Sequence, residues 1–155
     1  MDIYLVRHGE SDANAGLTLD NALRFARETR SAGIALFEQP VRAWDDLVAF
    51  RARLRDAGSS TPFSIDESVT TADDVDRALN TGAADAVNIK IMKSGIFEAL
   101  AIADRAREEG LTRMIGGMVE SRLAMGTSAC LAAGLGGFSF IDLDTPLFLA
   151  EDPFA

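Results

Sequence analysis

Short aliphatic runs alternate with longer segments of helical periodicity along nearly the whole chain, and this alternation limits the possible folds more than any other feature. In the helical segments, for example residues 18–31 and 42–56, apolar residues recur every three or four positions. Such repetition is typical of a parallel sheet covered by helices. The predicted strands are residues 2–6, 34–37, 62–65, 86–90, 113–115 and 138–141.

Two architectures fit this pattern, an open doubly wound sheet and part of a (β/α) barrel. The composition, 48% hydrophobic and 25% charged, is ordinary for one globular domain and does not choose between them. A complete barrel needs about 250 residues, whereas this chain has 155. If the chain is barrel-like, we therefore expect a partial TIM-type barrel of about six βα units.

The charge balance limits the possible partners. A net charge of −9 argues against a nucleic acid, because the average surface would repel phosphates. A small molecule or a cation fits better. No apolar run approaches the roughly 20 residues that a membrane-spanning helix needs, and the first residues do not have the layout of a secretory signal. We therefore expect no membrane partner and a cytoplasmic location.

Charged side chains follow four successive predicted strands, close to the point where each strand ends. They are the carboxylates of Asp12, Glu38 and Asp66 and the amine of Lys90. In parallel β/α folds the carboxyl ends of the strands share one face, so these four groups are expected to converge there. Taken singly, each is more often a helix cap or a surface charge, and only the ordered set favours a site.

The chemistry of such a set is specific. Three carboxylates with open coordination positions suit Mg²⁺, a hard cation that prefers oxygen ligands. A metal held in this way stabilises the enediolate that forms when a proton α to a carboxylate is removed. Lys90 can accept that proton when its amine is neutral. The residues thus predict a magnesium-dependent enzyme that abstracts a proton next to a carboxylate.

Four short motifs carry these residues and match a known family. They resemble the muconate-lactonizing subgroup of the enolase superfamily, and within it the dipeptide epimerases, from Asp12 to the end of the chain. The resemblance implies a (β/α) barrel, Mg²⁺ bound by Asp12, Glu38 and Asp66, and Lys90 as acid/base catalyst. The motifs are Asp12-Ala-Asn-Ala-Gly16, Phe37-Glu-Gln-Pro40, Asp66-Glu-Ser68 and Asn88-Ile-Lys90-Ile-Met-Lys93-Ser-Gly95.

The last third of the chain points to the substrate. By the same resemblance, Asp142 and Asp144 receive the α-ammonium of a dipeptide, and Glu120 is a weaker candidate for substrate binding. Two carboxylates two residues apart on an extended segment point to the same side, which suits one cation. Relatives with such a metal site also catalyse cycloisomerisation and dehydration, so only the aspartate pair indicates a dipeptide. Lys93 is expected to be a supporting or surface charge.

The first fourteen residues resemble a different family. They are similar to the opening of a histidine phosphatase of the phosphoglycerate-mutase type, in which His8 would be the phosphoryl acceptor and Arg7 would bind phosphate. Because His8 is the only histidine, a second one that such a site needs is missing. Phosphoryl transfer at His8 remains an alternative function, and a catalytically silent barrel fragment is another.

We therefore expect residues 1–155 to form one truncated barrel domain, with a phosphatase-like strand in residues 1–11 and barrel units in residues 12–155. The resemblance implies that a capping domain, two barrel strands and an opposing catalytic lysine are missing. A partial barrel leaves strand edges open, and open edges pair with other chains. We accordingly expect a homo-oligomer.

Overall fold

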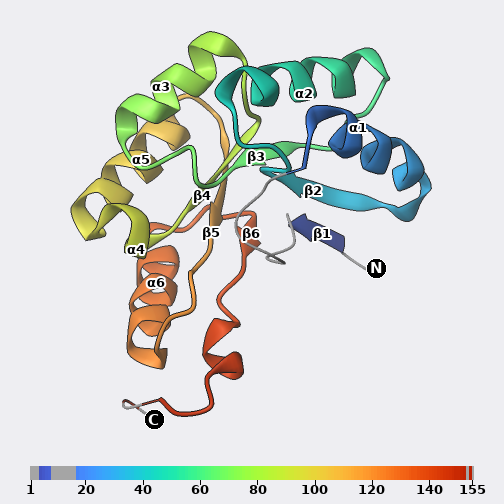
Figure 1. The fold of residues 1–155 in the computed structure, drawn as a ribbon. Helices are drawn as coiled ribbons and strands as arrows, with labels where there is room; N and C mark the ends of the chain where they lie inside the picture. Colours follow the sequence, from blue (N-terminus) through green and yellow to red (C-terminus); the bar gives the residue numbers. More distant parts are fainter. Residues whose placement is uncertain (1–3, 8–16, 153, 155) are drawn as a thin grey trace. The chain divides into compact units, whose positions relative to one another are not determined.

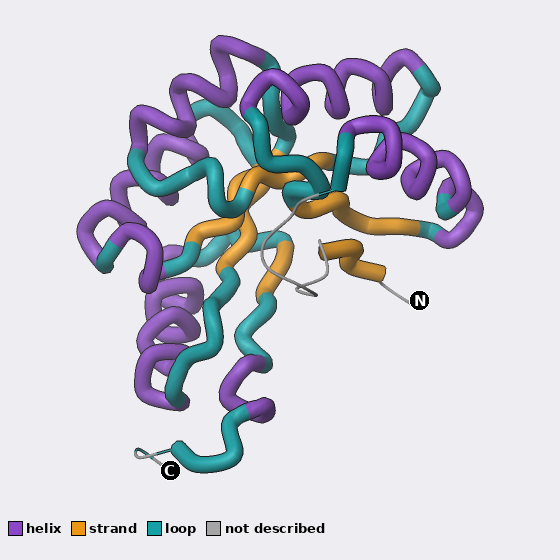
Figure 2. The backbone as a smooth tube through the Cα atoms, viewed as in Figure 1, coloured by secondary structure: helices purple, strands orange, loops and turns teal. Residues whose placement is uncertain are grey.

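The computed structural model describes residues 4–7, 17–152 and 154, and it divides into two compact units. Among these residues, the first unit comprises 4–7, 17–68 and 76–86, and the second comprises 69–75, 87–152 and 154. Figure 1 shows the elements of each unit in sequence colours, and Figure 2 separates helix from strand.

The first unit repeats a strand followed by a helix. Its strands are parallel, with β1 paired to β2 and β2 paired to β3, and Phe37 lies in register with Phe63. The elements are β1 (Tyr4–Arg7), α1 (Leu19–Glu28), the 3₁₀ turn η1 (Arg30–Ala32), β2 (Ile34–Glu38), α2 (Trp44–Asp56), β3 (Phe63–Ile65) and most of α3 (Ala72–Thr81).

The second unit continues the same repetition. β5 and β6 are parallel, with Met114 opposite Phe140, and the Gly116 N–H donates to the Ile89 carbonyl at 3.0 Å. The elements are β4 (Ala86–Ile89, apart from its first residue), α4 (Ile91–Ser94), α5 (Ile96–Glu108), β5 (Thr112–Ile115), α6 (Arg122–Leu135), β6 (Phe140–Ile141) and the 3₁₀ turn η2 (Thr145–Phe148).

The predicted alternation of strands and helices is confirmed, but several boundaries differ. The helix expected over residues 18–31 ends at Glu28, and the chain continues as the η1 turn into Gly33, whose φ of 69° is a left-handed conformation. A short helix, α4, lies between β4 and the longer helix α5. The last strand, expected over 138–141, contains only two residues. Short elements carry too little periodicity for their boundaries to be predicted from the sequence.

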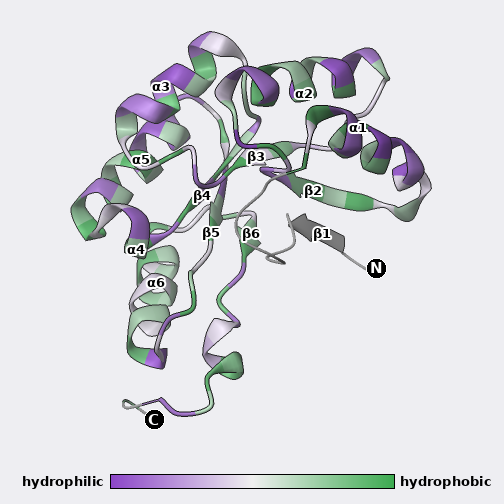
Figure 3. Cartoon of the chain, viewed as in Figure 1, coloured by the Kyte–Doolittle hydropathy of each residue, from purple (hydrophilic) through white to green (hydrophobic). Residues whose placement is uncertain are grey.

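Each unit has an apolar interior of its own. In the first, the Phe50 ring of α2 lies between two strand residues, with centroids 6.0 Å from Phe37 and 5.3 Å from Phe63. Edge-on aromatic contacts of this kind add to the free energy gained by burial. In the second, Ile102 and Ala106 of α5 are buried, as are Ile89 and Ile115 of the strands. Figure 3 shows hydrophilic and hydrophobic stripes on α1 and α3, as expected for helices that cover a sheet on one side.

Trp44 joins two helices of the first unit. Its ring, at the start of α2, lies under the Arg77 guanidinium of α3 with 3.9 Å between Cζ and the ring centroid. The indole N–H donates to the Thr81 hydroxyl at 3.3 Å. The cation–π contact and the hydrogen bond together fix α3 against α2.

Asp85 connects α2 to the beginning of β3 in the same unit. Its carboxylate accepts from Arg51 at 2.7 Å, pairs with Arg55, and accepts from the Phe63 N–H at 3.2 Å. Partial burial raises the pKa of Asp85, but the hydrogen bond and charge of Arg51, then Phe63 and Arg55, outweigh it. The pKa of Asp85 therefore lies below its ordinary value of 3.8.

We expect Asp85→Asn to lower the free energy of unfolding at pH 7 by about 1–2 kcal/mol, since it removes a partly buried charged hydrogen bond. A carboxylate with a lowered pKa stabilises the fold above its ordinary pKa of 3.8, and this contribution is lost as pH falls through the folded value. Urea unfolding at pH 7 and pH 3 measures both effects. The free energy of unfolding of the variant should change less between these two pH values than that of the parent. An equal change in both proteins would contradict the role assigned to Asp85.

No helix within the described ranges combines the length and the apolar content needed to cross a membrane.

Candidate functional site

Two of the predicted metal ligands lie together in the first unit. Glu38 is the last residue of β2, and Asp66 directly follows β3. Because β2 and β3 are parallel, with Glu38 opposite Ser64, both residues lie at the carboxyl edge of these strands. Glu38 is 1% exposed and Asp66 is 0% exposed. The structure therefore brings these two carboxylates to one buried edge, as the sequence predicts.

Gln39 connects the two strand ends. Its side-chain oxygen accepts from the Asp66 N–H at 2.6 Å and from the Ser68 N–H at 3.1 Å. Its side-chain amide donates to the Ser68 hydroxyl at 2.7 Å. The backbone at Gln39 has a φ of 28°, which turns the chain out of β2 just before Pro40. Sequence reasoning missed this residue, although it lies between a predicted ligand and a proline.

The donor set fits a magnesium ion. Carboxylate oxygens are the ligands that Mg²⁺ prefers, and two carboxylates at a buried edge are costly in the absence of a cation. Asp12, the third predicted ligand, lies outside the described residues. Within residues 4–7, 17–152 and 154, no group of three His, Cys, Asp or Glu side chains is placed to hold a metal. Of the three predicted ligands, the structure therefore describes two, Glu38 and Asp66, at one strand edge.

Lys90 occupies the corresponding strand end in the second unit. It directly follows β4, is 2% exposed, and has its amine 4.0 Å from the Met118 sulfur. Lysine is rarely buried to this degree, so the position is unusual for a merely solvated charge. Lys93, expected to be a supporting or surface charge, is half-buried and donates to the Asn88 carbonyl at 3.0 Å.

Glycines let the segment after β5 pack closely in the second unit. A Cβ at residue 116 would lie 2.7 Å from the Asn88 side-chain oxygen, and one at residue 117 would overlap the Met125 methyl group. Gly116 and Gly117 therefore accommodate the close approach of the Asn88 and Met125 side chains. Neither has a positive φ.

Glu120 ends this segment and is largely buried. Its carboxylate accepts from the Met118 N–H at 2.8 Å, so it shapes the loop after β5. This bond gives Glu120 a structural role beside the substrate-binding role predicted for it.

The predicted substrate aspartates follow β6. The N–H of Asp142 donates to the Ile115 carbonyl at 2.9 Å, which continues the parallel pairing beyond the last strand residue, and its side chain is half-buried. Asp144 is exposed and directly precedes η2 as its N-cap, with φ −88° and ψ −8°. The extended segment on which the pair was predicted therefore ends between the two aspartates.

Comparisons with known proteins point to one family. The profile of the family described as Enolase C-terminal domain-like matches residues 11–154. An aromatic dipeptide epimerase of Herpetosiphon aurantiacus is 47% identical over 147 residues, covering 92% of this chain and 40% of the relative. Residues 1–10 of the phosphatase-like opening lie before the matched region, and these comparisons lend no support to a histidine phosphatase.

Solved structures match the fold. A mandelate racemase/muconate lactonizing protein from Herpetosiphon aurantiacus has a TM-score of 0.81 and 45% identity, covering 90% of this chain and 40% of that one. A dipeptide epimerase from Enterococcus faecalis, complexed with Mg and the dipeptide L-Leu-L-Tyr, has a TM-score of 0.81 and 31% identity, covering 91% of this chain and 40% of that one.

These matches settle the fold class. The chain is an α/β protein, a partial (β/α) barrel rather than a doubly wound sheet. It spans about two-fifths of the length of the relatives that it matches, which is 40% for the aromatic dipeptide epimerase.

Proposed function

Since this chain belongs to the enolase C-terminal domain-like family, we propose that it carries the barrel portion of a magnesium-dependent isomerase that removes the proton α to a carboxylate. The observation that supports this proposal most directly is the pair of buried carboxylates, Glu38 and Asp66, at neighbouring strand ends. Racemases and epimerases are the reaction class, because the relatives at 47% and 31% identity are named dipeptide epimerases.

Glu38 and Asp66, with Asp12, are the proposed magnesium ligands. Their oxygens match the preference of Mg²⁺, and the Enterococcus faecalis epimerase is described in complex with Mg. When bound, the ion supplies positive charge that stabilises a substrate enediolate. The burial of Glu38 and Asp66 excludes water from their edge, which strengthens every electrostatic interaction made there.

Lys90 is the proposed acid/base group. Its amine takes the α-proton from the substrate carbon or returns a proton to it. The burial of this residue removes competing water, and the bond from Lys93 to the Asn88 carbonyl fixes the end of the strand that precedes it. A group held in this way needs little reorganisation during the reaction.

The proposed substrate is a dipeptide or another small carboxylate. Asp142 and Asp144 would accept its ammonium group, and Glu120 would contribute at the loop after β5. A cytoplasmic location belongs to the same proposal. So does self-association, since β6 has a sheet neighbour on one side only within the described chain. A monomer in size-exclusion chromatography would contradict the self-association.

The test is proton NMR of L-Ala-L-Glu in deuterated buffer. With the purified chain and MgCl₂, the glutamate α-proton signal should decay as deuterium replaces hydrogen at that carbon. The same sample treated with EDTA should show no decay above the background. If a cooperatively folded sample exchanges no α-proton at saturating magnesium, the proposed reaction is wrong for this chain.

A further inference from the structure

The segment that joins β2 to α2 contains a side chain whose polar atoms are all directed at the end of β3. Gln39 is 3% exposed. It is the only residue other than glycine with a positive φ in the described ranges. A left-handed conformation is unfavourable for such a residue, and it persists only where its surroundings stabilise it. The contacts of Gln39 supply that stabilisation.

Those contacts connect Gln39, the residue that follows Glu38, to the backbone of Asp66. The side-chain oxygen accepts from the N–H groups of Asp66 and Ser68, and the side-chain amide donates to the Ser68 hydroxyl. The backbone N–H of Gln39 itself donates to the Ser64 carbonyl at 2.9 Å. Gln39 follows Glu38 directly in the chain, so these four bonds fix the backbones of Glu38 and Asp66 relative to each other.

We infer that Gln39 is a positioning residue, which holds the Glu38 and Asp66 carboxylates at the separation that a divalent cation needs. The inference rests on the proposed magnesium site. Two carboxylates at one buried edge repel each other when no cation lies between them. The four bonds of Gln39, here called the Gln39 clamp, oppose that repulsion, and because the Gln39 amide is neutral they add no charge to the site. Partners that hydrogen-bond to metal-ligating side chains contribute about 10–100-fold in metal affinity, and we take this as the scale for Gln39, which acts through the Asp66 backbone.

A simpler role for Gln39 would be closure of a turn, and the two roles predict different results. A turn residue affects the free energy of unfolding, whereas a positioning residue also affects metal affinity in the folded protein. Ser68 offers a milder variant, because Ser68→Ala removes one of the four bonds and leaves the Asp66 N–H bond in place.

The experiment measures Mn²⁺ binding by electron paramagnetic resonance in the full chain, with Mg²⁺ as competitor. Gln39→Met keeps a side chain of similar length and removes the three side-chain bonds. We expect its metal affinity to fall about 10–100-fold, and that of Ser68→Ala to fall less. Gln39→Glu keeps the acceptor for both N–H groups and should bind metal more tightly than Gln39→Met.

Asp85→Asn is the matched control, because it weakens the same unit at the opposite end of β3 and leaves the Gln39 bonds intact. It should lose stability and keep its metal affinity. A folded Gln39→Met that binds metal within threefold of the parent would overturn the inference.

Amide hydrogen exchange distinguishes a wrong role for Gln39 from a wrong magnesium site. Exchange at Asp66 and Ser68 should accelerate in Gln39→Met, which tests the clamp without metal. If the parent binds no divalent cation while this exchange still depends on Gln39, the metal site is wrong and the residue only closes a turn. If exchange at Asp66 does not respond to Gln39→Met, the clamp itself is wrong.

Discussion

Replacing Lys90 by methionine should lower the rate of magnesium-dependent α-proton exchange by about 10²–10⁴-fold, the contribution typical of a positioned general acid or base. Methionine retains an unbranched chain of similar length at a position that is 2% exposed, so the packing beside Met118 is kept. Exchange is followed by proton NMR, and stability by circular dichroism.

Lys93→Met is the matched control for this variant, because these two lysines are the only ones in the chain. Lys93 donates to a backbone carbonyl, and its replacement should slow exchange by less than about tenfold, as the loss of one hydrogen bond implies. Equal losses in the two variants would mean that Lys90 acts through structure or charge and not as the proton acceptor.

Phe50→Ala should lower the free energy of unfolding by about 3–5 kcal/mol, the range observed for large-to-small changes in protein cores. Phe50 is fully buried, and its ring contacts Phe37 and Phe63 edge-on, so alanine leaves a cavity between α2 and two strands. Small domains have few kcal/mol of stability to lose, so this variant should be close to unfolded at 37 °C. Urea unfolding measures the change.

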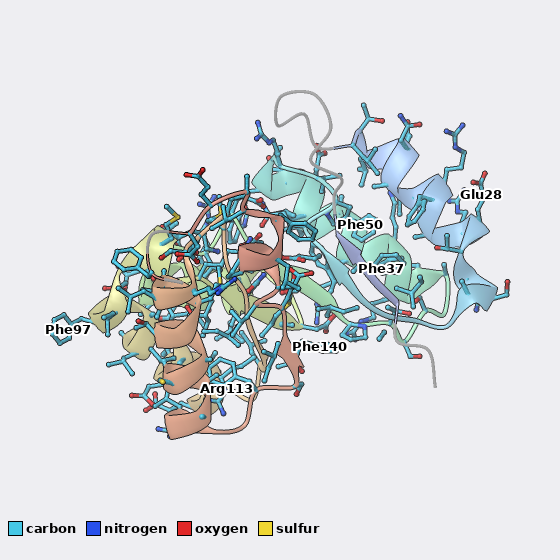
Figure 4. The ribbon with its side chains drawn as sticks, turned by 90° about the horizontal axis from the view of Figure 1, so that it is seen from below. Glu28, Phe37, Phe50, Phe97, Arg113 and Phe140 are labelled. Atoms are coloured by element: carbon cyan, nitrogen blue, oxygen red, sulfur yellow. The ribbon has the colours of Figure 1, made fainter. Side chains whose placement is uncertain are left out.

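Phe97→Ala provides the comparison, since the same substitution is made at a side chain that is 89% exposed. Figure 4 shows Phe97 pointing away from the helices, whereas Phe37 and Phe50 lie next to each other. Phe97→Ala should change the free energy of unfolding by no more than about 0.5 kcal/mol, as most surface substitutions do. A small effect at Phe50 would contradict the assignment of this aromatic cluster as the centre of the first unit.

Much of this site could be predicted from the sequence, because the ends of strands in β/α proteins can be recognised from the residue pattern. An aliphatic run that stops at a charged residue locates Glu38, Asp66 and Lys90 at strand termini, and the structure confirms those locations. Their roles as metal ligands and base stay predictions. Asp12 lies outside the described residues, as does His8.

Features that depend on contacts between distant residues could not be predicted in this way. Gln39 differs from a surface glutamine only through Asp66 and Ser68, which lie 27 and 29 residues later. The close approach at Gly117 comes from Met125, a side chain of the following helix. Neither partner produces a periodicity or a motif, so only the fold reveals them.

The contact between Trp44 and Arg77 gives the chain a natural optical probe. Trp44 is the only tryptophan. It lies in α2, and its ring and its indole N–H contact Arg77 and Thr81 of α3, both in the first unit. Intrinsic fluorescence therefore follows the separation of α3 from α2, whereas far-ultraviolet circular dichroism averages the helices of both units. If the two signals change together on heating, the two units unfold as one cooperative structure. If the fluorescence changes at a different temperature, the first unit folds independently of the second.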